Sequence, residues 1–333
     1  MKAFILDRYG SADAVRSGEM PEPALLDDEM LVQVRAAGVN PLDIKIRNGE
    51  LKRLLRYRLP IILGHEVAGV VTRVGSRVQR FKAGDEVYAR LSKDRTGGFA
   101  EFVSVSEEAA AIKPRTLTMD EAASIPLVGL TAWQALVERA NLRKGQKTLI
   151  HAGSGGVGTL AIQLAKHLGA TVATTTSSGN FPLVKRLGAD VAIDYRRDDF
   201  AAVLRDYDVV LNSLTGNTFE KSLHVLKPGG ILISLPGPPD PAYAKEIGAS
   251  WIVSLAMRLM SYRIRRSAKQ HHVRYSFLMM RASGDQLGEL ASLIDSGQMR
   301  PVIDRVFPFE ATKEAMAYVE TGRAKGKVVV KVS

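Results

Sequence analysis

Three of the glycines near the middle of the chain have the spacing G-x-G-x-x-G. Gly153, Gly155 and Gly158 follow an apolar stretch at 148–150 and precede a helical pattern of apolar residues that ends at Gly169. In such a strand-to-helix turn the first glycine permits a tight bend, the second lets backbone approach a pyrophosphate, and the third packs helix against strand. N–H groups at the helix N-terminus would then face the phosphates. An ordinary strand-to-helix turn is the alternative, but the context favours a dinucleotide-binding loop formed by Gly153, Ser154, Gly155, Gly156, Val157 and Gly158.

The end of the next expected strand indicates which nicotinamide cofactor this loop would take. An NAD site carries an Asp or Glu roughly 20 residues further on, bonded to the ribose 2′-hydroxyl. The strand end at 171–178 contains no carboxylate and instead offers hydroxyls from Thr175, Thr176, Ser177 and Ser178. Hydroxyls can donate to a 2′-phosphate, which a carboxylate would repel. We therefore expect NADPH rather than NADH, with a merely polar strand end as the alternative.

The elements that would position these residues change character near residue 120. Short strands punctuated by Gly and Pro come first, at 31–35, 68–72, 85–88 and 99–103, which is an all-β pattern. Strands then alternate with helices, as in a doubly wound parallel sheet, and are expected at 147–150, 171–174, 191–193, 208–211 and 230–234. A last strand at 327–331 is expected to return to the first domain.

Composition limits the chemistry that is available. With 333 residues, of which 46% are hydrophobic, the chain is long enough for two domain cores. It has no cysteine, which excludes disulfides, thiolate catalysis and any cysteine-based zinc site. The N-terminus shows no secretory signal, and we expect a cytoplasmic protein.

Positive charge is concentrated between Glu246 and Asp285. The whole chain carries a net charge of +11, and segment 247–284 has seven basic residues and no acidic one. Such a run can contact nucleic acid, anionic lipid or an acidic partner, but we favour the interpretation that it is a solvated helix face. Its apolar stretch at 247–260 is interrupted by Arg258 and is too short to span a bilayer.

Several motifs together resemble the medium-chain dehydrogenase/reductase superfamily. Gly64-His-Glu-Val-Ala-Gly69, followed by Gly75 and Val78, is similar to the G-H-E signature of that superfamily, and further similar phrases stand at 81–87, 98–102, 122–126, 187–190 and 326–330. The resemblance implies an α/β protein with a GroES-like β-rich catalytic domain, formed by residues 1–122 and 283–333. It also implies a Rossmann domain, a doubly wound parallel sheet over 123–282 that binds NADP(H), and an active-site cleft between the two.

The residue at position 40 indicates which subgroup of this superfamily the chain resembles. The zinc-dependent members have a cysteine ligand where this chain has Asn40, within Gly38-Val-Asn-Pro-Leu-Asp43. The chain therefore resembles the zinc-independent quinone oxidoreductases, zeta-crystallins and alkenal/alkenone reductases. His65 and Glu66 alone do not complete a zinc set, which normally needs three protein ligands, so we expect no metal; a site that adds Asp43 is the alternative, and we expect His65 to be structural.

The resemblance also implies roles for individual residues. Thr131 would contact the cofactor phosphates, and Tyr195 would lie beside the adenosine ribose and 2′-phosphate. Where the family often has a lysine near that phosphate this chain has Asn180, and Lys185, Arg196 or Arg323 can compensate. Asn212 and Leu235 end the fourth and fifth strands, the edge at which open α/β sheets bind ligands.

The activity implied is hydride transfer from NADPH to a quinone or to the alkene of an α,β-unsaturated carbonyl. Hydrogen-bond donors must then stabilise the developing charge on the substrate oxygen, and our candidates are Asn40, Lys45 and Tyr57. The resemblance leaves an alternative for Asn40, which is donation to the nicotinamide ribose. The alternatives are a zinc-type alcohol dehydrogenase, or an NADPH-binding protein whose basic segment contacts RNA or membrane. The family implies a homodimer.

Overall fold

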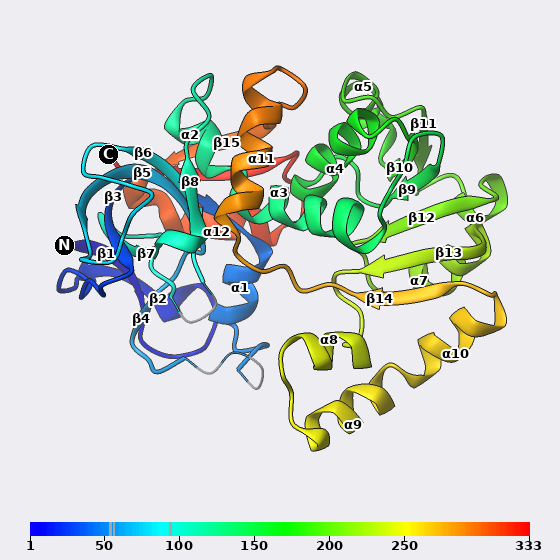
Figure 1. Cartoon of the computed structure of the whole chain (residues 1–333), viewed down its shortest axis with the longest axis horizontal. Coiled ribbons are helices and arrows are strands. Elements are labelled where there is room, and N and C mark those ends of the chain that lie inside the picture. The colour runs from blue at the N-terminus through cyan, green and yellow to red at the C-terminus, as the bar shows by residue number, and fades with distance from the viewer. Residues whose placement is uncertain (53–54, 56, 93–94) are drawn as a thin grey trace. The chain divides into compact units, whose positions relative to one another are not determined.

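The computed structural model describes residues 1–52, 55, 57–92 and 95–333. The chain forms two compact units, one of residues Met1–Leu130 with Arg281–Ser333 and the other of Thr131–Met280. The first unit is built mainly from antiparallel strands, and the second is a parallel sheet with helices. Figure 1 labels the elements of both units.

The first unit contains a large sheet and a small one. Within the described residues the large sheet has seven strands in the order β15-β16-β3-β5-β6-β8, with β7 also paired to β3, and the small sheet has the order β2-β1-β4. The strands are β1 Lys2–Leu6, β2 Val15–Glu19, β3 Glu29–Val39, β4 Ile61–Ile62, β5 Glu66–Val74, β6 Glu86–Arg90, β7 Phe102–Ser106, β8 Ala110–Ile112, β15 Ile303–Pro308 and β16 Lys327–Lys331. The strand expected at 99–103 begins only at Phe102. The prediction that 327–331 returns to the first domain is confirmed, because β16 pairs antiparallel with β3.

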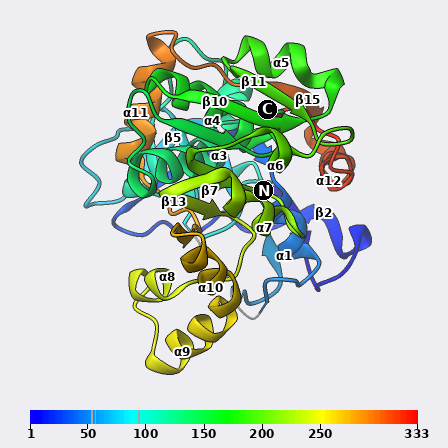
Figure 2. The ribbon, with the colours of Figure 1, turned by 90° about the vertical axis from the view of Figure 1, so that its right-hand side faces the viewer.

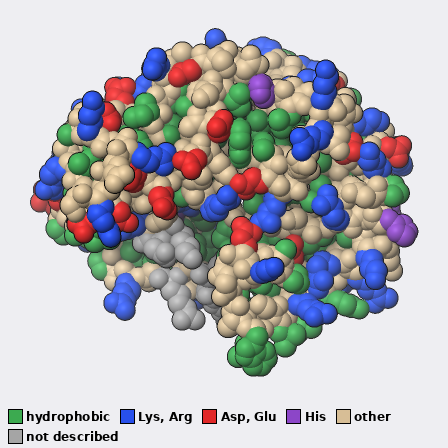
Figure 3. Space-filling model, in the orientation of Figure 1, with side chains coloured by type: hydrophobic (Ala, Val, Ile, Leu, Met, Phe, Trp, Pro, Cys, Tyr) green, Lys and Arg blue, Asp and Glu red, His purple; other side chains and the backbone are tan. Residues whose placement is uncertain are grey.

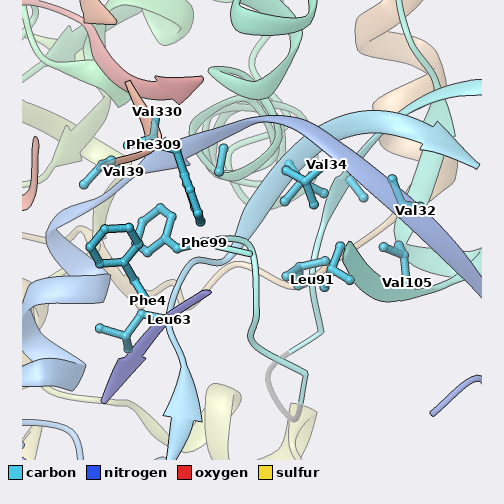
Figure 4. Close-up of a cluster of buried hydrophobic side chains, with 14 of the residues drawn as sticks. Phe4, Val32, Val34, Val39, Leu63, Leu91, Phe99, Val105, Phe309 and Val330 are labelled. Carbon is cyan, nitrogen blue, oxygen red and sulfur yellow. The ribbon is translucent and has the colours of Figure 1, made fainter. Parts of the chain in front are cut away.

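A continuous apolar core holds this unit together. Valines of β3 and β7 meet aromatic and aliphatic side chains from distant parts of the chain, among them Phe4, Leu63, Phe99 and Phe309 (Figure 4). Phe4 and Phe309 meet edge to face with ring centroids 5.2 Å apart, a favourable aromatic geometry. Burial of β3 on both faces explains why its sequence is nearly continuous in apolar residues rather than alternating.

In the described part of the first unit, four helices border the strands, and a fifth leads into the second unit. They are α1 Pro41–Arg47, α2 Met119–Ala123, α11 Gly284–Asp295 and α12 Thr312–Glu320, followed by α3 Pro126–Trp133, which continues as a π-helix over Gln134–Arg139. α2 begins with a capping box in which Thr118 and Glu121 satisfy each other's backbone N–H groups. The amphipathic helix expected around Leu287 and Leu290 is α11, with both leucines buried.

The second unit is a six-stranded parallel sheet in the order β11-β10-β9-β12-β13-β14. Numbered along the chain within the unit, this order is 3-2-1-4-5-6, the arrangement of dinucleotide-binding domains. The strands are β9 Lys147–Ile150, β10 Thr171–Thr176, β11 Val191–Asp194, β12 Tyr207–Asn212, β13 Leu226–Ser234 and β14 Arg274–Phe277. Five of these strands agree with the sequence prediction, and β14 is an edge strand that the prediction missed.

Helices connect the strands of this unit (Figure 2). They are α4 Gly156–His167, α5 Phe181–Arg186, α6 Phe200–Val203, α7 Thr218–Val225, α8 Pro241–Glu246, α9 Trp251–Met260 and α10 Tyr262–Gln270. α4 contacts β9 and β10, α7 contacts β12 and β13, and α10 contacts α7 and β14. In the described part of the chain, no helix combines the length and apolar character needed to cross a bilayer.

Candidate functional site

The glycine-rich loop lies between β9 and α4, as predicted. Gly153 has no room for a side chain, because a Cβ there would stand 1.9 Å from Thr174 Oγ1. A Cβ on Gly158 would stand 2.4 Å from the carbonyl oxygen of Ala152, so this glycine allows the helix to approach the strand end. The two positions therefore need glycine for the steric reasons that the motif implies.

The loop presents backbone N–H groups at the start of α4. Gly155 is the N-cap residue and carries no side chain that could bond the first N–H groups of the helix. Ala152 has φ of 52°, in the left-handed region, which turns the chain sharply at the end of β9. A helix N-terminus with free N–H groups attracts anionic groups, so the loop fits a pyrophosphate.

Hydroxyl and amide groups cluster beside this loop at the end of β10. Ser154 Oγ accepts hydrogen bonds from Thr176 Oγ1 at 2.9 Å and from Asn180 Nδ2 at 3.0 Å. Asn180 Nδ2 also donates to Ser177 Oγ at 3.2 Å. Asn180 stands where the family often has a lysine. Its hydrogen bonds connect the glycine-rich loop to the predicted 2′-phosphate site.

The neighbouring strand end adds charged and aromatic groups. Thr176 and Asp194 are partners in the parallel register of β10 and β11, and Tyr195 follows at once as an exposed residue. Hydrogen bonds from the Arg196 backbone N–H and from Ser178 hold the pKa of Asp194 below its usual value, so this carboxylate is ionised and orders the loop. The Arg196 guanidinium lies over the Tyr195 ring at 5.7 Å, which puts a cation at the edge where a 2′-phosphate is predicted.

Other predicted cofactor residues occupy varied positions. Asn212 is buried at the end of β12, where its side chain accepts from the Leu214 N–H and donates to the Leu214 carbonyl. Leu235 follows β13 and bonds through its N–H to the Asn212 carbonyl. Thr131 is buried on α3, and Arg323 belongs to the first unit, exposed after α12. Their roles toward a cofactor stay predictions.

The first unit holds a buried polar cluster that begins with Asn40, Asp43 and His65. Asp43 Oδ1 lies 2.5 Å from His65 Nδ1, and its other oxygen accepts the Asn40 backbone N–H at 2.8 Å. All three side chains are buried. Among the described residues none bonds His65 Nε2. Pairing to the carboxylate implies that Nδ1 carries a proton.

Glu66 and Lys327 complete this cluster. Lys327 Nζ donates to Glu66 Oε1 at 2.7 Å, to Asn40 Oδ1 at 2.6 Å and to the Val39 carbonyl at 3.1 Å. Asn40 Nδ2 donates to Glu66 Oε1 at 2.8 Å, and the Leu127 N–H donates to Glu66 Oε2 at 2.7 Å. These two neighbours determine which end of the Asn40 amide is oxygen. The ammonium can only donate and the carboxylate can only accept, so the amide oxygen faces Lys327 and the amide nitrogen faces Glu66.

Arg90 lies buried beside the same cluster. Burial lowers the pKa of its guanidinium, while the negative charges of Glu66 and Asp43 oppose that shift. Two buried cations, Arg90 and Lys327, thus balance two buried carboxylates, Asp43 and Glu66. Lys327 and Arg90 were absent from the candidates predicted from sequence; the only signal for Lys327 was its place in the motif at 326–330.

A zinc ion does not fit these residues. Asp43 is already the partner of His65, and Glu66 already accepts hydrogen bonds from Lys327, Asn40 and Leu127. Within the described ranges no group of three His, Cys, Asp or Glu side chains is arranged to hold a metal. A catalytic zinc normally takes three protein ligands.

The other two catalytic candidates differ in their surroundings. Lys45 is exposed on α1, and Tyr57 is half-buried, close enough to Arg90 for its charge to affect that guanidinium. The structure therefore brings Asn40 into a buried network and leaves Lys45 in solvent. Whether any of the three touches a substrate stays a prediction.

These features define a class of protein, a GroES-like β-rich unit joined to a dinucleotide-binding parallel sheet. Residues 26–115 match the alcohol dehydrogenase GroES-like domain, and residues 187–330 match the zinc-binding dehydrogenase domain. The chain is 37% identical over 341 residues to a 2-methylene-furan-3-one reductase of Solanum lycopersicum, covering 99% of this chain and 79% of that one.

Solved structures agree with this match. A quinone oxidoreductase from Coxiella burnetii is 34% identical, with a TM-score of 0.88 over 100% of this chain and 99% of that one. The Escherichia coli quinone oxidoreductase complexed with NADPH is 26% identical, with a TM-score of 0.83 over 100% of both chains. The chain belongs to the medium-chain dehydrogenase/reductase superfamily, in its quinone oxidoreductase-like group. It is an NAD(P)H oxidoreductase.

Proposed function

We propose that this protein is a zinc-independent reductase that transfers hydride from NADPH to a quinone or to the alkene of an α,β-unsaturated carbonyl. The observation that carries the proposal is the pairing of a glycine-rich pyrophosphate loop with a hydroxyl and amide cluster at the end of β10. Relatives whose names state quinone reduction, furanone reduction and bound NADPH support it.

The preference for NADPH follows from the groups near Ser154. Thr176, Ser177 and Asn180 can all donate to a phosphate, and Arg196 adds a positive charge at the same edge. Asp194 is the one carboxylate that the structure describes in this group, and it is already bonded to the Arg196 and Ser178 N–H groups. Charge-assisted donors are the strongest binders of phosphate oxygens.

When bound, NADPH would supply a hydride to the electron-poor substrate carbon. A proton from solvent or from a side chain would then go to the oxygen of a quinone, or to the α-carbon of the enolate formed from an enone. Stabilising charge on that oxygen without a metal requires hydrogen-bond donors. Asn40 is our first candidate, because its bond to the Gly38 carbonyl is long, at 3.4 Å, and can be exchanged for a substrate oxygen. Glu66 and Lys327 hold the rest of its amide in place.

The decisive experiment measures NADPH and NADH consumption by purified protein treated with a chelator. The acceptors are an ortho-quinone, a short enone and a simple aldehyde. We expect turnover of the quinone or the enone, selective for NADPH and unchanged by the chelator. Activity lost on chelation and restored by zinc would refute the zinc-independent mechanism, and tight NADPH binding without turnover of any acceptor would favour a binding protein.

A variant pair tests the role of Asn40 in this reaction. N40A removes the amide, and we expect kcat to fall at least tenfold with NADPH affinity unchanged, by loss of one oxyanion donor. N48A is the matched control, because Asn48 is an exposed asparagine that ends the same helix, and we expect a change below threefold. Equal loss in both variants contradicts the assignment of Asn40.

We also propose that the protein acts in the cytoplasm as a homodimer. The homodimer follows from the family resemblance and the compartment from a chain with no cysteine. Light scattering of the purified protein measures the mass directly, and a monomer at micromolar concentration contradicts the homodimer.

A further inference from the structure

α9 exposes an unusual amount of apolar surface. Eight of the ten residues in Trp251–Met260 are apolar, and six large side chains point into solvent. Trp251 is 75% exposed and Leu259 67%, whereas Met257 is the buried residue of the helix. A helix that is apolar on most sides is normally covered on most sides, and a contiguous exposed apolar patch marks a contact surface. The exposed residues are Trp251, Ile252, Val253, Leu255, Leu259 and Met260.

Cations follow directly on α10. One face of α10 packs on the core of the second unit through Ile264 and Ala268, while Arg263, Arg266 and Lys269 face solvent. A groove on this surface is lined by Tyr262, Arg265, Arg266, Lys269 and Gln270. In Figure 3, hydrophobic side chains gather over α9 and basic side chains beside them over α10.

These cations are not neutralised by the protein. Across the described residues of 247–280, six basic side chains stand without an acidic residue in the segment and without a carboxylate ion pair. Glu220 of α7 is the acidic group that reaches α10, and it accepts a hydrogen bond from Ser267 Oγ rather than pairing with an arginine. An anionic partner would therefore complement the charge of this surface.

We propose that α9 and α10 form a docking surface for anionic lipid headgroups, with α9 lying in the plane of the membrane interface. Leu259, Met260 and Trp251 would enter the boundary of the acyl chains, and the α10 cations would contact lipid phosphates. At ten residues α9 is about 15 Å long, half of the roughly 30 Å of a hydrocarbon core, which suits a helix that lies on the surface.

Charge and polarity distinguish lipid from other occupants. A second copy of this chain seated on the same patch would place two strongly basic segments face to face, an unfavourable contact. RNA would use the cations and aromatic rings but would leave five large aliphatic or thioether side chains of α9 in water. Only a surface that is both anionic and apolar satisfies α9 and α10 together.

Trp251 is a built-in reporter for the first experiment. The chain has two tryptophans, and W133F leaves Trp251 as the sole tryptophan. We expect its emission to shift to shorter wavelength with vesicles of phosphatidylglycerol and phosphatidylcholine, and to be quenched by brominated acyl chains. The affinity for vesicles of pure phosphatidylcholine should be lower by roughly tenfold or more, because each Lys or Arg near an anionic surface adds several-fold to affinity.

Variants of exposed residues separate the two components. R263E/R266E reverses charge on α10, and L259S/M260S removes apolar surface from α9; each should reduce vesicle co-sedimentation roughly tenfold or more. R143E/K144E makes the same charge change on an exposed loop of the second unit, and V203S changes an exposed apolar residue of α6. Both controls should bind within about twofold of wild type. Melting temperatures within a few degrees of wild type establish that all variants are folded.

Three outcomes overturn the proposal. Equal binding to neutral and anionic vesicles removes the electrostatic part, and unchanged binding by L259S/M260S removes the apolar part. Retention of a single-stranded RNA, lost in R263E/R266E, together with no vesicle binding shows that the basic surface serves nucleic acid instead. None of these results depends on catalytic turnover, so the docking surface and the reductase activity are tested independently of each other.

Discussion

Replacing Lys327 by methionine tests the buried polar cluster of the first unit. Lys327 Nζ lies 2.7 Å from Glu66 Oε1, and the two side chains are 6% and 0% exposed. K327M keeps most of the side-chain volume but leaves Glu66 as a buried carboxylate with only the Asn40 amide and the Leu127 N–H as partners. Breaking a buried pair from one side costs about 3 to 5 kcal/mol, and we expect that loss in the free energy of unfolding.

A double-mutant cycle turns this expectation into a sharper test. E66Q/K327M removes both charges, so the uncompensated carboxylate disappears and the double variant should be more stable than K327M alone. The coupling free energy between the two positions should reach about 2 kcal/mol, within the range seen for residues in contact. Urea unfolding followed by far-ultraviolet circular dichroism measures all four proteins.

The same strand supplies the control. Lys331 ends β16 and is exposed, so K331M makes the same chemical change in water and should alter the free energy of unfolding by less than about 0.5 kcal/mol. The cluster is not held together by this ion pair if K327M and K331M lose equal stability. The same conclusion holds if E66Q/K327M loses more unfolding free energy than the two single variants lose together.

Three further predictions concern the second unit. G153A should weaken NADPH binding at least tenfold in fluorescence titration, because its Cβ would clash with Thr174 Oγ1, while G288A on α11, with open space around its Cβ, should bind within threefold; equal affinities would show that the loop does not contact the cofactor. S177D should raise KM for NADPH roughly tenfold and leave KM for NADH nearly unchanged, since a carboxylate repels the 2′-phosphate; parallel changes for both cofactors contradict the location of the phosphate. Burial lowers the pKa of His151 from 6.5 to about 3, so the unfolded chain binds this proton first as pH falls below 6.5, and stability should fall by about 2 kcal/mol between pH 6.5 and 4.5. H151Q should lack that part of the slope in urea unfolding at several pH values, and an unchanged slope would assign the pH dependence to other groups.

The cofactor-binding half of the protein was largely readable from sequence. Gly153, Gly155 and Gly158 report local steric needs, and the strands around them are short apolar runs whose hydrogen-bonding partners follow from the alternation with helices. Five of six parallel strands and the start of α4 agree with prediction for this reason. β14 was missed because its sequence, Arg-Tyr-Ser-Phe, has no apolar run and becomes a strand only beside β13.

The candidate residues of the first unit show the opposite case. Asn40 was singled out by its place in a motif, yet the structure shows its amide engaged by Glu66 and by Lys327, 287 residues away. Lysine at the start of a strand usually faces solvent, and nothing near position 327 signals burial. The antiparallel pairing of β16 with β3 creates the contact.

The basic segment makes the same point at the surface. The charges of 247–284 and the apolar run of 247–260 are visible in the printed sequence, which favoured a solvated helix face. Folding determines which of those apolar side chains the core accepts, and it accepts Met257 while leaving Trp251 and Leu259 in water. Sequence by itself determined the local geometry of the nucleotide loop and the class of fold, because both depend on short-range sterics and periodicity. Only the tertiary structure decided which charges are buried together and which apolar groups stay exposed, because burial depends on what distant segments bring to the same place.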